Sequence, residues 1–272
     1  MSSFEDASRP CRPTIDRAGR LASIRFDRDR IGQLTRLIYD ETLRSSPYIR
    51  QANFERISSL DLKFLFDLYD RLFFDAFLGE AAREECDGRL KFRVSMRMTK
   101  AAGQTTRIGL NRPNLAISAT VSIEIAVSGE LLFRAFRHHG RPVVVCGRSC
   151  ADRLEALQRV FEHELIHLAE FLVWRSSNCS ASNYQDIVAR IFAHEDVRHE
   201  MATPREIAAE VHGLHVGDTV SFEFEGRILV GRLNRITKRG SILVEDPKGA
   251  PYSNGKRYLT YYVALPLLKK LG

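Results

Sequence analysis

The run from Asp152 to Trp174 constrains the fold most, because it contains neither proline nor glycine. Its apolar residues recur at helical spacing, which predicts one long helix. Residues His163 to His167 within it form the pattern HExxH. Two histidines four positions apart lie one turn apart on the same face of a helix. Both rings can then bind one tetrahedral Zn²⁺ at about 2.0–2.1 Å.

Glu164 directly follows the first histidine, on the side where a metal-associated water molecule would sit, and it is the candidate catalytic base. The same pattern also occurs by chance in long helices, as surface residues or as a core histidine. Here the flanking residues Leu165, Ile166 and Leu168 are apolar, so we expect a buried or cleft-lining helix. A buried carboxylate is costly unless it has a partner, and a metal with its water would supply one. The pattern therefore predicts a zinc site.

Composition limits the possible classes of protein. With 272 residues, 44% hydrophobic and 28% charged, the chain has room for one sizeable domain and a small second one. It lacks the run of about 18 apolar residues that a membrane span needs, so no membrane partner is expected. The N-terminal residues have an early acidic pair and no apolar segment, which predicts a cytoplasmic protein without a signal peptide. Its five cysteines are expected to be free thiols or metal ligands.

The residues before position 213 predict an α+β domain. Residues 1–25 show no periodicity and are expected to form a flexible tail, which leaves 26–212 for the domain. Helices are predicted at 26–45, 59–77, 131–136 and 183–192, around strands at 90–98, 105–110, 118–127 and 143–145.

The sequence changes character at about Gly213, where short alternating segments separated by tight turns predict a small β-barrel over residues 213–272. Basic residues outnumber acidic ones there, and tyrosines are interleaved with them. This composition favours a nucleic-acid surface for DNA or RNA, although a solvated barrel would look the same. The candidate contact residues are Arg235, Lys238, Arg239, Lys256 and Arg257.

The order of these segments resembles the SprT-like zinc metallopeptidase family, which includes the Spartan DNA–protein crosslink protease. The resemblance spans about residues 60–199 and rests on three segments: Ser95 to Thr105, the HExxH helix, and Ile191 to His199. The last 60 residues resemble the SH3-like or KOW-like barrels of some bacterial members. The family implies a zincin fold, in which helices pack on a small sheet and a protein or peptide substrate adds to an edge strand. The best candidate edge is 120–128.

The family also implies a third zinc ligand, a histidine that this chain lacks. Counting back from Phe192 places Ser180 at that position, and serine is a poor zinc ligand. The adjacent Cys179 offers a thiolate, and we expect His163, His167 and Cys179 to form the site, with Asp186 as a weaker candidate.

Other assignments remain open. His194 lies 14 residues after Ser180, about 21 Å along a continuous helix, and could reach the metal only if the helix breaks. Arg97 or Tyr184 would be candidates to stabilise an oxyanion. Without a third ligand the chain would instead be a non-catalytic nucleic-acid or transcription-associated binding protein with a degenerate zincin fold.

Overall fold

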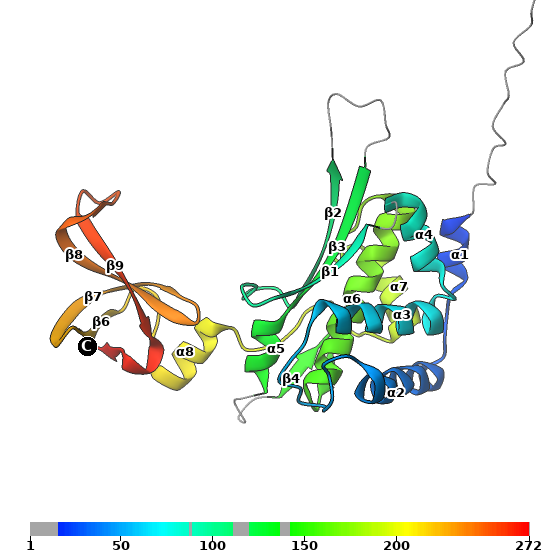
Figure 1. Ribbon diagram of the computed structural model, residues 1–272, viewed down its shortest axis with the longest axis horizontal. Coiled ribbons are helices and arrows are strands. Elements are labelled where there is room, and N and C mark those ends of the chain that lie inside the picture. The colour runs from blue at the N-terminus through cyan, green and yellow to red at the C-terminus, as the bar shows by residue number, and fades with distance from the viewer. Residues whose placement is uncertain (1–15, 87–88, 111–119, 137–141, 272) are drawn as a thin grey trace, which may run out of the picture.

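The protein has a mixed α+β architecture, as expected from its sequence. The computed structural model describes residues 16–86, 89–110, 120–136 and 142–271. Figure 1 shows a larger lobe of helices around a small sheet and a smaller, β-rich lobe formed by the C-terminal residues. Each lobe has its own cluster of buried apolar side chains. No helix in the described part of the chain is long and apolar enough to cross a membrane.

The larger lobe is built around one central helix, α6, which extends from Arg153 to Trp174. Asp152 caps its N-terminus by accepting hydrogen bonds from the backbone N–H groups of Leu154 and Glu155. Most of its side chains are buried, because other helices and the sheet pack on several of its faces. The other helices of this lobe are α1 (Arg17–Ser23), α2 (Arg28–Ser45), α3 (Ser59–Phe73), α4 (Phe77–Cys86), α5 (Gly129–Ala135) and α7 (Ser182–Phe192).

Three strands form the sheet of the larger lobe: β1 (Leu90–Ser95), β2 (Gly103–Leu110) and β3 (Thr120–Ser128). Their order is β1-β3-β2, with β1 parallel and β2 antiparallel to β3. The predicted edge at 120–128 is therefore wrong, because β3 is the central strand and β2 lies at the edge beside α6. The alternation in 120–128 correctly places Ile123 and Ile125 in the core. Alternation reports which face is buried, however, and carries no information on which strands pair on either side.

The helices differ from the sequence prediction mainly at the N-terminal tail and after Phe73, where α4 was not predicted. Within the predicted tail, α1 is ordered: Asp16 caps it, Leu21 is fully buried, and Arg17 donates a hydrogen bond to the Leu172 carbonyl at 3.0 Å. Seven residues are too few for periodicity to reveal such a helix. The helix predicted at 59–77 ends at Phe73, because the next turn contains two residues with positive φ. Residues 1–15 of the tail lie outside the described part.

A short hairpin and the segment after α7 cover the N-terminal half of α6. The hairpin consists of β4 (Val143–Val145) and β5 (Arg148–Cys150), and the sequence indicated only the first of these strands. Val145 forms a bridge with His199, and the Cys146 N–H donates to the Arg198 carbonyl at 2.7 Å. These contacts hold the segment after α7 against the hairpin, beside α6.

The smaller lobe contains a five-stranded antiparallel sheet in the order β10-β6-β7-β8-β9. The helix α8 (Pro204–His212) packs on it, and Ala208 joins its core, so the predicted boundary at 213 falls at the end of α8. Lys238 contacts Glu130 of α5 at 2.9 Å and thereby joins the two lobes. The strands are β6 (Thr219–Phe224), β7 (Arg227–Ile236), β8 (Arg239–Pro251), β9 (Arg257–Ala264) and β10 (Lys269–Lys270).

Candidate metal centre

The two histidines of the HExxH pattern face each other on the exposed stripe of α6. Their Nε2 atoms are 3.1 Å apart, and both rings are half-buried. Cys179, from the loop between α6 and α7, brings its Sγ atom to the same place. The three potential ligand atoms of His163, His167 and Cys179 lie within 4.8 Å of one another. The structure therefore brings together the three residues that the sequence suggested as a set.

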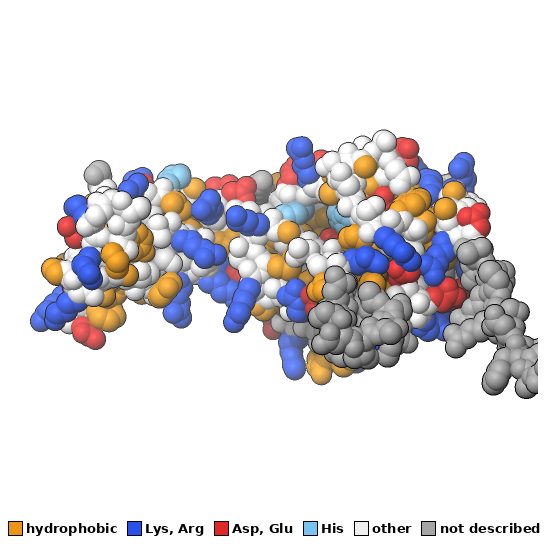
Figure 2. All heavy atoms as spheres, turned by 90° about the horizontal axis from the view of Figure 1, so that it is seen from above, with side chains coloured by type: hydrophobic (Ala, Val, Ile, Leu, Met, Phe, Trp, Pro, Cys, Tyr) orange, Lys and Arg blue, Asp and Glu red, His pale blue; other side chains and the backbone are white. Residues whose placement is uncertain are grey.

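These residues line a cleft of about 380 Å³ between the edge strand β2, helix α6 and the segment at 197–199. The cleft wall includes the residues from Lys100 to Thr105, which lead into and begin β2. Figure 2 shows histidine side chains at the bottom of a hollow in the larger lobe. The site is thus open to a ligand from one side, and the protein core closes it on the other.

Hydrogen bonds to the second histidine fix which of its nitrogens carries the proton. The Ser177 hydroxyl donates its one proton to a Glu170 carboxylate oxygen at 2.5 Å. His167 Nδ1 lies 2.6 Å from the same hydroxyl oxygen and must therefore be the donor. This leaves the His167 Nε2 lone pair directed toward His163. A carboxylate that orients a metal-binding imidazole through its other nitrogen is a common feature of metal sites.

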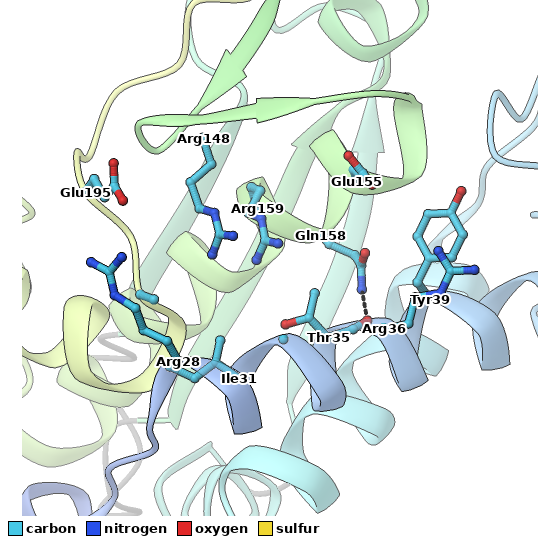
Figure 3. A pocket seen from close by; sticks show the side chains of 12 residues that line it. Arg28, Ile31, Thr35, Arg36, Tyr39, Arg148, Glu155, Gln158, Arg159 and Glu195 are labelled. Atoms are coloured by element: carbon cyan, nitrogen blue, oxygen red, sulfur yellow. Dashed lines mark hydrogen bonds between the residues drawn. The ribbon is translucent and has the colours of Figure 1, made fainter.

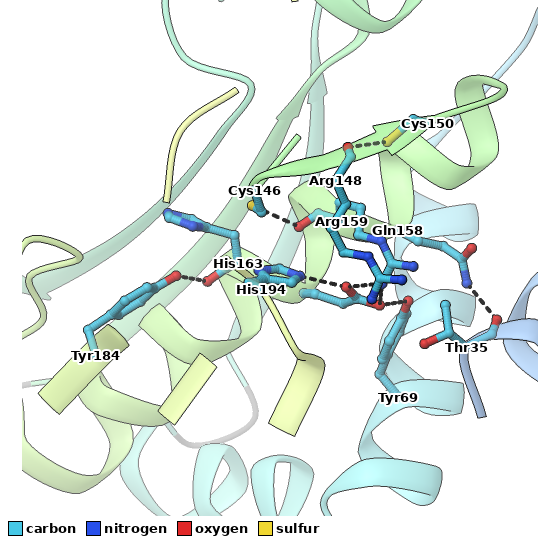
Figure 4. Close-up of polar contacts among 11 residues, drawn as sticks. Thr35, Tyr69, Cys146, Arg148, Cys150, Gln158, Arg159, His163, Tyr184 and His194 are labelled. Carbon is cyan, nitrogen blue, oxygen red and sulfur yellow. Dashed lines mark hydrogen bonds and ion pairs between the residues drawn. The ribbon is translucent and has the colours of Figure 1, made fainter. Parts of the chain in front are cut away.

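The first histidine is held through its backbone. Tyr184 of α7 is fully buried, and its hydroxyl donates to the His163 carbonyl at 2.8 Å (Figure 4). The Tyr184 ring lies 5.2 Å from the His163 ring and 4.7 Å from the His167 ring. His163 Nδ1 is buried without a partner among the described residues, and its Nε2 atom faces the Nε2 lone pair of His167.

The two imidazoles are uncharged at neutral pH. Burial lowers the pKa of His163 to about 3, with a smaller contribution from His167, and burial lowers the pKa of His167 to about 4. Neutral imidazole is the form that binds a metal ion.

Glu164 is buried beneath the cleft, against the start of β2. Its carboxylate accepts a hydrogen bond from the Thr105 hydroxyl at 2.7 Å. Burial raises the pKa of Glu164 to about 8, although hydrogen bonds from Thr105 oppose this shift. A Cβ atom at Gly103 would lie 2.4 Å from Glu164 Oε1, so only glycine leaves room for the carboxylate at this position. Gly103 at the sheet edge therefore leaves the space that the Glu164 carboxylate occupies.

The donor set fits a zinc ion. Two neutral imidazole nitrogens and one thiol sulfur converge, and nitrogen and sulfur ligands favour zinc over Mg²⁺ or Ca²⁺. Three protein ligands are the number found in catalytic zinc sites, and the three residues here line an open cleft.

The other candidate ligands lie elsewhere. Ser180 and Asp186 are exposed, and Asp186 lines a different cavity with His194. The helix α7 does end at Phe192, where Ala193 adopts a left-handed conformation. His194 then turns inward, but its Nε2 atom lies 2.8 Å from Glu162 and it is not part of the metal cluster.

Neither candidate for oxyanion stabilisation directs a free donor into the cleft. Arg97 is exposed and does not line the cleft. The Tyr184 hydroxyl already donates its proton to the His163 carbonyl.

A buried network behind the site escaped the sequence analysis. The Glu162 carboxylate is fully buried and accepts hydrogen bonds from Tyr69 at 2.8 Å and Arg159 at 2.8 Å, with His194 at 2.8 Å (Figure 4). Burial alone would raise the pKa of Glu162, but the Arg159 guanidinium and His194 hold it below its usual value. The sequence does contain a signal for this network: Glu162 is a second glutamate next to His163, and it lies on the apolar side of the helix. Glu170, three residues after His167, was detectable in the same way.

The candidate nucleic-acid residues of the smaller lobe fall into two groups. Arg235 and Arg239 are exposed and form no ion pair within the part of the chain that the structure describes. The others have partners in the protein: Lys238 contacts Glu130 at 2.9 Å, Lys256 contacts Glu245 at 2.6 Å, and Arg257 donates to the Gly249 carbonyl at 2.9 Å.

The tyrosines of this lobe differ in the same way: Tyr262 is 67% exposed, whereas Tyr261 packs between Phe222 and Phe224. The larger lobe thus brings several functional side chains together at one place, whereas the exposed residues of the smaller lobe are not gathered in this way.

No protein-family model, curated protein or solved structure matches the chain.

Proposed function

We propose that the chain is a zinc-dependent metallopeptidase of the SprT-like type that acts on protein or peptide substrates. The observation that carries the proposal is the convergence of His163, His167 and Cys179 in a cleft that also contains a buried glutamate. When bound there, a zinc ion supplies a Lewis acid that polarises a carbonyl group and lowers the pKa of a water molecule.

The chain's own residues supply the proton transfer and the orientation. Glu164 is the proton acceptor and later donates that proton to the leaving amine, because it lines the cleft beside the metal ligands. Thr105 fixes the carboxylate at 2.7 Å, and Glu170, through Ser177, fixes the His167 ring.

The edge strand β2 offers a binding mode for the substrate. One side of β2 pairs with β3, and no strand pairs with its other side in the described part of the chain. Its first residues line the cleft next to Glu164. An extended peptide that pairs with this free edge would cross the cleft beside the metal ligands. Binding through backbone groups favours unfolded or flexible substrates, because a folded protein does not present an extended strand.

The smaller lobe would tether the enzyme to DNA or RNA and thereby raise the local concentration of proteins bound there. Its strand order places the last strand, β10, beside the first, β6, as a small SH3-like barrel requires. Arg235, Arg239 and Tyr262 are the exposed residues available for phosphates and bases. We further propose a cytoplasmic location, for which the four described cysteines would remain free thiols.

The proposal is tested by cleavage of an unfolded protein, such as fluorescently labelled casein. We expect cleavage by the purified chain, loss of cleavage in a chelator, and recovery with about one equivalent of zinc. Zinc binding without any cleavage would favour the alternative, a nucleic-acid-binding protein with a degenerate zincin fold. Cleavage that persists in the chelator would contradict a metal-dependent mechanism.

A further inference from the structure

A second cavity, of about 290 Å³, lies along α6 one to two turns before the metal cleft. The helices α2 and α6 form its floor and sides, and Arg148 of β5 and Glu195 lie at its top (Figure 3). None of the residues that line it lines the metal cleft. The proposed peptidase activity therefore gives this cavity no role.

The cavity wall carries more positive than negative charge. Two of its cations have partners in the protein: Arg36 contacts Asp40 at 2.9 Å, and Arg159 contacts Glu162 at 2.8 Å. Arg28 and Arg148 form no ion pair with any residue that the structure describes. The charged residues of the wall are Arg28, Arg36, Arg148, Arg159, Glu155 and Glu195.

Arg148 is the most informative of these cations. Figures 3 and 4 both show its guanidinium group beside that of Arg159. Glu162 forms an ion pair with Arg159 at 2.8 Å, whereas Arg148 forms none with a described residue, although Glu155 and Glu195 also line the wall. Two adjacent guanidinium groups, of which only that of Arg159 is paired with a carboxylate, favour the binding of a further anion.

A buried hydroxyl on the floor of the cavity also lacks a partner. Thr35 is 7% exposed, and its Oγ1 atom forms no hydrogen bond among the described residues. Thr42, on the same helix, instead donates to the Ile38 carbonyl at 2.6 Å, as helical threonines commonly do. The backbone carbonyl of Thr35, in contrast to its hydroxyl, has a partner, because the Gln158 side chain donates a hydrogen bond to it at 3.0 Å. A buried hydroxyl without a partner costs stability, and a ligand that accepts its proton would recover that loss.

We propose that this cavity binds a phosphate group, held by the guanidinium groups of Arg148, Arg159 and Arg28 and by the Thr35 hydroxyl. All four are donors, and a phosphate offers several charged acceptor oxygens to such a set. A volume of about 290 Å³ is at the lower end of ligand-binding sites and leaves room for a small group attached to the phosphate. The phosphate belongs either to a small molecule or to the terminus of a nucleic-acid strand, and the test separates these sources.

The test uses the full-length protein and inorganic phosphate, with chloride at equal ionic strength as the reference. Phosphate is expected to raise the thermal midpoint, and titration calorimetry gives the dissociation constant. Arg148→Gln should weaken binding at least about tenfold, because it removes a charge-assisted hydrogen bond to the phosphate. Thr35→Val should also weaken binding, and it should leave the phosphate-free protein at least as stable as the wild type because it removes an unpartnered hydroxyl. The matched control is Arg44→Gln, because Arg44 lies on α2, pairs with Glu41 and does not line the cavity.

A pair of oligonucleotides of one sequence, with and without a 5′-phosphate, identifies the source. If the 5′-phosphate strengthens binding and Arg148→Gln removes that gain, the ligand is a strand terminus. If inorganic phosphate binds but the 5′-phosphate brings no gain, the ligand is a small molecule. The proposal is overturned if phosphate has no effect beyond that of chloride, or if Arg148→Gln and Arg44→Gln bind it equally. Zinc content and cleavage are measured separately, so failure of this proposal leaves the peptidase proposal intact.

Discussion

The metal cleft and the exposed surface of the C-terminal sheet use polar groups in different physical settings. In the cleft, Glu164 and His167 are each held by a hydrogen bond to a neighbouring side chain, because a buried polar group without a partner is costly. On the sheet, Arg235 and Arg239 extend into solvent without an ion pair among the described residues. Burial therefore gives the cleft one defined geometry, whereas the sheet offers charge without fixed positions. Substitutions should accordingly have large and specific effects in the cleft and small, graded effects on the sheet.

The largest effect is expected from Glu164→Gln. Removal of a general base typically lowers a rate by about 10²–10⁴-fold, and the amide can still accept the Thr105 hydrogen bond. Cleavage of labelled casein should fall by about that factor, while zinc content stays unchanged. Glu41→Gln, on the surface of α2, serves as the control and should keep full activity. Unchanged cleavage by Glu164→Gln would contradict the role of Glu164 as the catalytic base.

The network behind the site should be the most sensitive to loss of charge. Glu162→Gln leaves the buried Arg159 without its carboxylate, and breaking such a pair costs about 3–5 kcal/mol in the free energy of unfolding. The control is Glu124→Gln, which removes the more exposed ion pair with Arg93 and should cost at most about 1 kcal/mol. Urea denaturation of both variants measures the difference. Similar losses in the two variants would show that burial does not set the strength of these pairs.

The fit between the sheet edge and the carboxylate is tested by Gly103→Ala. The new Cβ would lie 2.4 Å from Glu164 Oε1 and 2.6 Å from its Cγ, so the carboxylate must move. A displacement of this kind should lower cleavage by about 10²-fold and cost about 1–3 kcal/mol of stability. Gly109→Ala, on the same strand, meets no atom within 4 Å and should leave activity unchanged. Equal activities of the two variants would show that the position of Glu164 is unimportant.

The pH dependence of the metal-free protein should reflect both kinds of buried group. The pKa values of His163 and His167 are lowered to about 3 and about 4, so the unfolded chain binds more protons than the folded one below its histidine pKa of about 6.5. Stability should therefore fall as the pH drops from about 6.5, by up to about 1.4 kcal/mol per pH unit for each histidine.

Glu164 acts in the opposite direction. Its folded pKa of about 8 means that the folded protein binds more protons than the unfolded chain between about 4.5 and 8, so stability falls as the pH rises through that range. Glu164→Gln should flatten the profile above pH 6.5, and His167→Gln should flatten it below. Denaturation in the presence of a chelator provides both profiles. A wild-type profile that matches both variants would contradict these assignments.

The smallest effects are expected on the C-terminal sheet. If Arg239 contacts a phosphate, Arg239→Gln should weaken binding to a single-stranded oligonucleotide modestly and reduce the slope of log K against log salt by about one unit. Lys256→Gln should change the slope less, because Lys256 already pairs with Glu245 at 2.6 Å. Fluorescence anisotropy over a range of salt concentrations measures both slopes. Identical slopes in the wild type and Arg239→Gln would place the nucleic-acid surface elsewhere.

The sequence predicted the elements with strong local signals. The long helix that carries His163 and His167 begins one residue after the expected start, because its capping residue and its apolar period are both local properties. The separation of the C-terminal strands from the larger lobe was predictable from turns and alternation for the same reason. The convergence of Cys179 with the two histidines agrees with the expected set, although that expectation came from a family resemblance.

The remaining features depend on tertiary contacts. The pairing of β2 at the sheet edge, and with it the role of Thr105, follows from strand order, which alternation does not encode. Glu170 and Glu162 acquire their roles through Ser177 and Arg159, whose positions depend on how loops and helix turns pack. The cavity that contains Arg148 joins elements far apart in the chain, so no local pattern indicated it.

The zinc content of the purified chain tests the central claim most directly. Elemental analysis of the protein, purified without added metal, should find about one zinc per chain in the wild type. His163→Ala should lose the metal, Cys179→Ala should lower its occupancy, and Asp186→Asn should keep it, because Asp186 lies outside the cluster. A wild-type chain that binds no zinc even when it is supplied, or a His163→Ala variant that binds as much as the wild type, would contradict the account.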